Sequence, residues 1–240
     1  MMNISPIVGL TLAVLVFLLT ALTSTENWSV FLDVHAALIV LGGTTAASLL
    51  SFSFTNMKDV AKVFVSRVLK GQLSRYEEVV DEIVDLSKGY RENSKYFEQK
   101  VSDIKNPFLK EAIQLTLEGG LADSDIDAIL VKRAQTHFKR YEEDAHIFQT
   151  LAKFPPAFGL LGAVVGMVSL MQGLGGADAI KTVGPAMAVA LVATLYGIAV
   201  ANFIFIPLGE NLAKYNRGDR IIRQMVIDGL KLVRSKNTLS

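Results

Sequence analysis

The chain has 240 residues, of which 51% are hydrophobic, and its formal net charge at neutral pH is +1. A mean hydropathy of +0.38 exceeds that of an ordinary soluble domain of this length, which argues against a soluble enzyme. Cysteine is absent, so disulfides, thiolate metal sites and cysteine nucleophiles are excluded.

Four apolar stretches of the chain predict four transmembrane helices. They cover residues 4–25, 34–54, 154–177 and 182–209, and none contains Asp, Glu, Lys or Arg. Each has about 20 residues or more, which is enough to cross a bilayer as a helix. The first lacks the basic flank and clear cleavage site of a signal peptide, so we expect it to stay in the membrane. The predicted fold class is therefore all-α, with a helical domain between the second and third spans.

These spans divide the chain into four parts. Residues 1–54 hold transmembrane helices 1 and 2, residues 55–152 a cytoplasmic helical domain, residues 153–209 transmembrane helices 3 and 4, and residues 210–240 a cytoplasmic C-terminal helix. Basic residues follow the second and fourth spans: Lys58, Lys62, Arg67, Lys70, Lys214, Arg217, Arg220 and Arg223. Because short loops rich in Lys and Arg stay in the cytoplasm, we expect both chain termini to be cytoplasmic.

Capping residues and apolar periodicity predict helices throughout the charged domain. One covers 56–69, and a second begins at a capping box formed by Ser74 and Glu77. A third covers 106–120, starting at an Asn-Pro pair and ending at two glycines, and a long one runs through 123–148 into the third span. Acidic and basic residues alternate along this domain, which is typical of a solvated surface or of docking to a charged partner. The alternation argues against nucleic-acid binding.

The third and fourth spans carry small residues at helical spacing, which let helix backbones approach closely in lipid. The small residues are Gly159, Gly162 and Gly166 on the third span, and Ala186, Ala190, Ala193, Gly197 and Ala201 on the fourth. The pattern leaves open whether these stripes pack within one chain, between copies, or both.

Because no span contains a carboxylate, a partner would have to supply the group that carries an ion across. The hydroxyl of Thr194 in the fourth span either bonds to its own helix or faces an ion or a neighbouring side chain. Pro156 stands at the start of the third span, where proline costs little, whereas Pro207 should kink or loosen the end of the fourth. His35 beside Asp33 is an interfacial polar residue or, alternatively, a proton relay.

Several segments carry distinctive motifs. They read FPPAFGLLG at 154–162, GPAMAVAL at 184–191, TLYG at 194–197 and NPFL at 106–109, and 33–43 and 202–208 belong to the same pattern. In this order they resemble MotA-type flagellar stator subunits of the MotA/TolQ/ExbB ion-channel family, over nearly the whole chain. The resemblance implies an ion-conducting motor protein of the bacterial inner membrane, with no covalent catalysis, no catalytic residue and no metal site.

The resemblance also implies partners. In MotA-type stators, several A-type subunits surround a dimer of a MotB-type partner, whose single membrane helix bears an aspartate and whose outer region binds peptidoglycan. This chain would then form a homo-oligomer, a pentamer around the partner dimer, embedded in membrane lipid. Ions would pass along the interface and bind the partner's aspartate while the ring turns and pushes the rotor protein FliG.

Four positions take roles in the ion pathway from the same resemblance. Thr194 matches the hydroxyl residue that faces the partner's aspartate, and Pro156 and Pro207 match the two functional prolines of the family. Ala163 matches a position that is alanine in proton-driven members and threonine in sodium-driven ones. H+ is therefore favoured over Na+ as the coupling ion, and no other cofactor is implied.

The charges expected to contact the rotor are Arg91 and Glu98. This segment departs from the family pattern, since Tyr90 occupies a usual basic position and Asn93 the usual glycine, so Lys88 is a substitute. Alternative functions stay open: a TolQ- or ExbB-like energising subunit, which usually has three spans, a sodium-driven stator, and a passive membrane scaffold.

Overall fold

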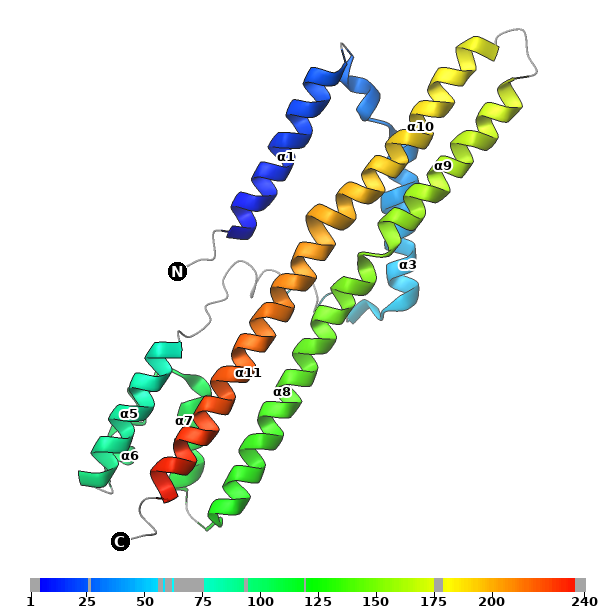
Figure 1. The fold of residues 1–240 in the computed structure, drawn as a ribbon. Helices are drawn as coiled ribbons and strands as arrows, with labels where there is room; N and C mark the ends of the chain where they lie inside the picture. The colour runs from blue at the N-terminus through cyan, green and yellow to red at the C-terminus, as the bar shows by residue number, and fades with distance from the viewer. Residues whose placement is uncertain are drawn as a thin grey trace. The chain divides into compact units, whose positions relative to one another are not determined.

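The computed structural model describes residues 5–25, 27–55, 58, 62, 76–92, 95–118, 120–174 and 179–235. All regular structure in these ranges is helical, which confirms the all-α class (Figure 1). The chain divides into two compact units, the first made of Met1–Gly71 with Asp144–Leu212 and the second of Gln72–Glu143 with Ala213–Ser240. The helix expected at 56–69 and its neighbour's capping residue Ser74 lie outside the described residues.

Four helices are long and apolar enough to cross a membrane, as predicted. The first span is α1 (Ser5–Ser24), and the second is α2 (Val34–Ala37) with the π turn η2 (Leu38–Gly42) and α3 (Gly43–Ser51). The third is α9 (Phe154–Gly173), and the fourth is α10 (Ala179–Val200) with the π turn η4 (Ala201–Phe205). A short 3-10 turn, η1 (Trp28–Phe31), lies between the first two spans.

The third and fourth spans each join a long helix. The helix α8 (Asp123–Leu151) is separated from α9 by only two residues, as expected for a long helix that leads into the third span. The helix α11 (Ile206–Ser235) follows η4 directly, so the change from apolar to charged sequence after Gly209 is not a helix end. Gly209 packs against Phe148 and Gln149, and a Cβ added at this position would lie 3.3 Å from the Cγ of Gln149.

The loosening expected near Pro207 takes the form of a π turn. Proline has no backbone N–H, so Pro207 cannot bond to the carbonyl one turn earlier, near Phe203. The wider turn of η4 ends at Phe205, two residues before the proline, and passes the chain into α11 without interrupting the helix. No proline occupies η2, so that π turn has a different origin.

The second unit has its own hydrophobic core. It is built by α5 (Tyr76–Glu92), α6 (Tyr96–Lys100), α7 (Pro107–Leu117) and parts of α8 and α11. The core residues are Val79, Leu86, Phe97, Ile104, Phe108, Leu109, Ala112, Ile113, Ile126, Leu130, Ile222, Val226, Ile227, Leu230 and Val233. The side chain of Asn106 accepts from the N–H groups of Phe108 and Leu109, each at 3.0 Å, which caps α7 where the sequence predicts.

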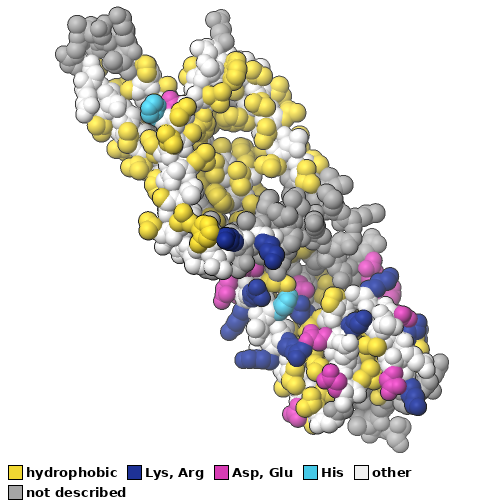
Figure 2. Space-filling view, turned by 180° about the vertical axis from the view of Figure 1, so that it is seen from behind, with side chains coloured by type: hydrophobic (Ala, Val, Ile, Leu, Met, Phe, Trp, Pro, Cys, Tyr) yellow, Lys and Arg dark blue, Asp and Glu magenta, His cyan; other side chains and the backbone are white. Residues whose placement is uncertain are grey.

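Ionic contacts stabilise the second unit along its long helices. The Arg234 side chain is only 6% exposed and donates to the carboxylate of Asp127 and, at 3.3 Å, to that of Asp123. Arg223 donates to Asp219 at 2.7 Å on α11. Figure 2 shows that charged side chains gather on this unit, whereas hydrophobic side chains cover the spans.

Candidate ion-pathway site

The third and fourth spans contact each other backbone to backbone (Figure 1). A Cβ added at Gly197 would lie 2.5 Å from the carbonyl oxygen of Pro155, and one at Gly159 would lie 2.9 Å from that of Ala193. Side-chain carbons do not approach other atoms this closely. The helices therefore meet here only because both positions lack a side chain.

The same contact continues along α9. A Cβ at Gly162 would lie 2.4 Å from the Cβ of Ala193, and one at Gly166 would lie 2.8 Å from the carbonyl oxygen of Ala186. The three glycines of α9 that make these contacts, Gly159, Gly162 and Gly166, are buried. The small-residue stripes thus pack against each other within one chain, which is one of the arrangements that their spacing left open.

Thr194 lies at this contact and its side chain is half-buried. Its hydroxyl donates to the carbonyl of Ala190 at 3.1 Å within α10, and it lies 3.4 Å from the carbonyl of Gly159 on α9. A hydroxyl has one proton, so the two carbonyls compete for it and the oxygen keeps lone pairs that can accept. The site can therefore offer an acceptor to a protonated group while staying bonded to its own helix.

Of the other residues expected along the ion pathway, Ala163 and Pro156 lie beside this contact on α9, whereas Pro207 lies ten residues beyond Gly197 along the chain. Ala163 lines a shallow groove of about 630 Å³ along the outward face of α9, together with Leu160, Val164, Met167, Val168, Met171 and Gln172. Pro156 is half-buried in the first turn of α9, and Pro207 is exposed in the first turn of α11. Ala163 thus faces outward next to the glycine contact, whereas Thr194 faces into it.

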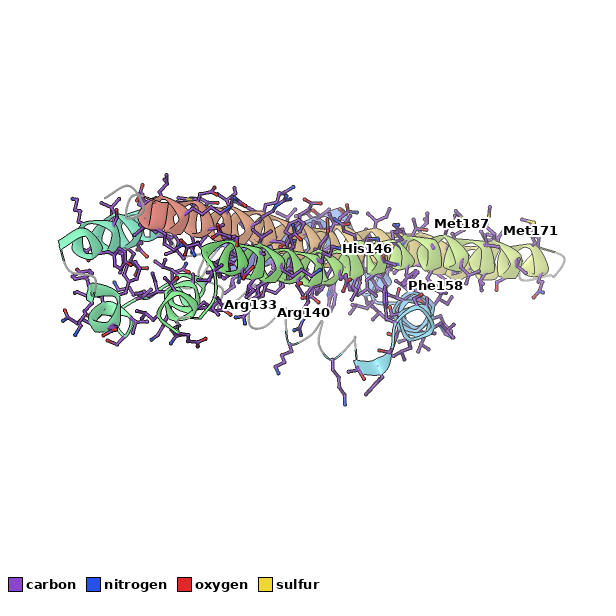
Figure 3. All side chains as sticks on the ribbon, turned by 90° about the horizontal axis from the view of Figure 1, so that it is seen from below. Arg133, Arg140, His146, Phe158, Met171 and Met187 are labelled. Carbon is purple, nitrogen blue, oxygen red and sulfur yellow. The ribbon has the colours of Figure 1, made fainter. Side chains whose placement is uncertain are left out.

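The second span supports α9 from another side. A Cβ at Gly43 would lie 2.2 Å from the ring of Phe158, so that ring packs directly on the backbone of α3. Figure 3 shows Phe158 leaving α9 on the side of α3, with Met171 further along the same helix. His35 is exposed in α2, where the side chain of Asp33 caps the helix by accepting from the N–H of Ala36 at 2.7 Å.

The charges expected to contact a rotor lie on α5 and α6. Lys88 on α5 and Glu98 on α6 are exposed. Arg91 is in the last turn of α5, but its side chain and the whole of Asn93 lie outside the described residues. Tyr90 stacks on Phe97 with ring centroids 4.2 Å apart, so the position that is usually basic is filled by a core aromatic.

Metal binding has no support in the part of the chain that the structure describes, where no group of three or more His, Cys, Asp or Glu could hold an ion. The site is built instead from backbone carbonyls, one hydroxyl and apolar surface. Such a surface fits an arriving helix that brings its own charged group.

Comparison with known proteins decides the family. The sequence pattern of the MotA/TolQ/ExbB proton channel family matches residues 100–225, more than half of the chain. This chain belongs to that family. The resemblance predicted from the motifs is therefore confirmed.

Relatives within the MotA/TolQ/ExbB family match most of the chain. Chemotaxis protein PomA of Vibrio alginolyticus is 27% identical over 229 residues, covering 95% of this chain and 88% of that protein. Motility protein A of Cereibacter sphaeroides is 30% identical over 240 residues, covering 96% and 88%. The solved structure of C. jejuni MotAB matches with a TM-score of 0.84 at 21% identity, covering 97% of this chain and 89% of that one. The fold, including all four spans, is therefore that of MotA.

Sequence reasoning could not rank one polar residue of this site, Tyr196, against Ser169, Gln172 and Asn202 in the same two spans. Tyr196 belongs to the TLYG motif, and its hydroxyl donates to the carbonyl of Phe31 and accepts from the N–H of Asp33 at 3.3 Å. Its position in the sequence could have pointed to it, since no other tyrosine lies within the predicted spans. Its partners could not be predicted, because they are more than 160 residues away in sequence.

Proposed function

We propose that this chain is the A-type subunit of a flagellar stator, which couples ion flow through the inner membrane to rotation of the motor. The observation that carries the proposal is the bare backbone contact of α9 with α10, with Thr194 at its centre and no carboxylate in any span. Membership of the MotA/TolQ/ExbB proton channel family supports it, as do relatives named for motility and chemotaxis.

In this function the chain supplies an apolar surface with one hydroxyl, and a partner supplies the carboxylate that carries the ion. The partner's membrane helix, of MotB type, would bring an aspartate to the outward face of α9 that carries Ala163, beside the helix contact that contains Thr194. Protonation of that aspartate removes its charge and lets it move along apolar surface, while the Thr194 oxygen accepts its proton in a hydrogen bond. Ala163 favours H+ as the coupling ion, because the family resemblance matches it to a position that is alanine in proton-driven members and threonine in sodium-driven ones. No covalent step by this chain is needed.

The assembly proposed is a pentamer of this chain around a partner dimer, with both termini in the cytoplasm. The basic residues that follow the second and fourth spans support this orientation. It places the second unit where the rotor protein FliG could meet it, with Lys88 and Glu98 as exposed contacts and Arg91 beside them on α5.

Ion flux tests the proposal. The chain is co-expressed with its single-span partner, opened by removal of the partner's plug segment, and cytoplasmic pH and sodium are recorded separately. Acidification that disappears when the partner's aspartate is neutralised is the expected result. Sodium uptake without acidification would contradict the H+ assignment, and absence of both fluxes would favour a passive scaffold. Flux that supports envelope transport but not swimming would indicate a TolQ- or ExbB-like energiser.

A further inference from the structure

One phenol links the fourth span to the connection between the first two. The Tyr196 hydroxyl donates to the carbonyl of Phe31, the last residue of η1, and accepts from the N–H of Asp33 at 3.3 Å. Asp33 is also the N-cap of α2, where its carboxylate accepts from the N–H of Ala36. A single side chain of α10 therefore holds both the end of η1 and the start of the second span.

The surroundings of Tyr196 make this link hard to replace. Its ring packs against a buried apolar cluster formed by Ala36, Val40, Val192 and Ala193. Backbone carbonyl and N–H groups that lose this partner must bond to water instead, because the apolar cluster offers them no polar group. Losing the phenol hydroxyl should therefore displace the connection rather than leave it in place with unpaired groups.

Tyr196 and Thr194 act on opposite sides of one helix. Residues two apart on an α-helix point about 200° away from each other. Thr194 reaches the carbonyl of Gly159 on α9, whereas Tyr196 reaches the connection that leads into α2. The next residue, Gly197, meets the carbonyl of Pro155, so this short segment of α10 is held from two sides.

We propose that Tyr196 is a positioning residue for the ion pathway. By holding the η1–α2 connection, it fixes the rotation of α10 about its own axis and hence the direction of the Thr194 hydroxyl. This role rests on the ion-pathway function proposed for Thr194. The proposal also gives the first two spans a role, because the connection between them holds α10 in place.

The link itself is testable through Trp28, the only tryptophan of the chain, which begins η1. Tyr196→Phe keeps the ring and removes the hydroxyl. In the full chain reconstituted in lipid vesicles, we expect this variant to lower the ratio of docked to undocked connection about tenfold, seen as stronger acrylamide quenching of Trp28. Tyr76→Phe, which changes an exposed tyrosine of α5, is the matched control and should leave quenching as in the parent chain. Equal quenching in all three proteins would overturn the link.

The positioning role is tested by a double-mutant cycle on ion flux in the complex with the partner. We expect Tyr196→Phe to lower flux about tenfold in the parent chain and to have no further effect in Thr194→Ala. Independent effects that multiply would overturn the positioning role, because Tyr196 would then act without Thr194. Normal flux in Thr194→Ala would instead contradict the ion-pathway function of Thr194, and the positioning role with it, while the Trp28 measurement would still report the link.

Discussion

Replacing Gly197 by alanine should force α9 and α10 apart at Thr194. The new Cβ would lie 2.5 Å from the carbonyl oxygen of Pro155, whereas ordinary contacts begin at 3.4 Å, so the helices must separate by about 0.9 Å. The nearest atoms belong to the backbone of Pro155, so no side-chain rotation relieves the overlap. Overpacking of this kind costs about 1–3 kcal/mol, against about 1 kcal/mol gained from the better helix propensity of alanine.

The expected net loss for Gly197→Ala is up to about 2 kcal/mol in the free energy of unfolding, measured by denaturant titration in detergent micelles with circular dichroism. The same separation stretches the 3.4 Å approach of Thr194 to Gly159 beyond hydrogen-bonding range, so ion flux should fall as well. Gly184→Ala is the control on the same helix, because a Cβ there meets nothing within 4 Å. Equal stability and flux in the two variants would refute the backbone contact as the basis of the site.

Four further changes test other parts of the chain. Thr194→Ala should lower flux about tenfold while the complex still purifies intact, since the hydroxyl bonds mainly to its own helix; unchanged flux would contradict the site. Gly43→Ala should lose about 1 kcal/mol of stability against the Phe158 ring, whereas Gly42→Ala, with open space, should not, as thermal unfolding of the two would show. Arg234→Met should cost about 1–2 kcal/mol, because Asp127 loses its buried guanidinium donor and keeps only Lys231 at 3.7 Å, and denaturant titration of the full chain measures this. Glu98→Lys should reduce spreading in soft agar without changing ion flux; loss of both would argue against a rotor contact.

The predictable parts of the fold follow from local signals. A charge-free stretch such as 154–177 has few alternatives to a membrane helix, because any other backbone would leave polar groups unpaired in lipid. Asn106 followed by proline gave the start of α7 for a similar reason, since both residues act within one turn.

Other features depend on contacts that no local pattern encodes. Small-residue spacing at Gly159 and Gly197 indicated close helix packing. Only the structure shows that these two helices contact each other within one chain. The hydrogen bonds of Tyr196 were hidden because their partners, Phe31 and Asp33, are backbone groups of a distant segment. The continuity of α11 past Gly209 was missed for another reason. A change in residue polarity marks where water begins, and a helix can cross that boundary unchanged.

The two π turns affect how the length of these spans can vary. A π turn encloses one residue more than an α turn, since its hydrogen bonds run from each residue to the fifth one along. Deleting one residue within η4 (Ala201–Phe205) or η2 (Leu38–Gly42) would therefore restore an α turn and leave the helix faces on both sides in register. A deletion elsewhere in a span would turn every following side chain by about 100° and carry a residue such as Thr194 away from its neighbours. Natural single-residue differences in length between related spans should accordingly concentrate at these two turns.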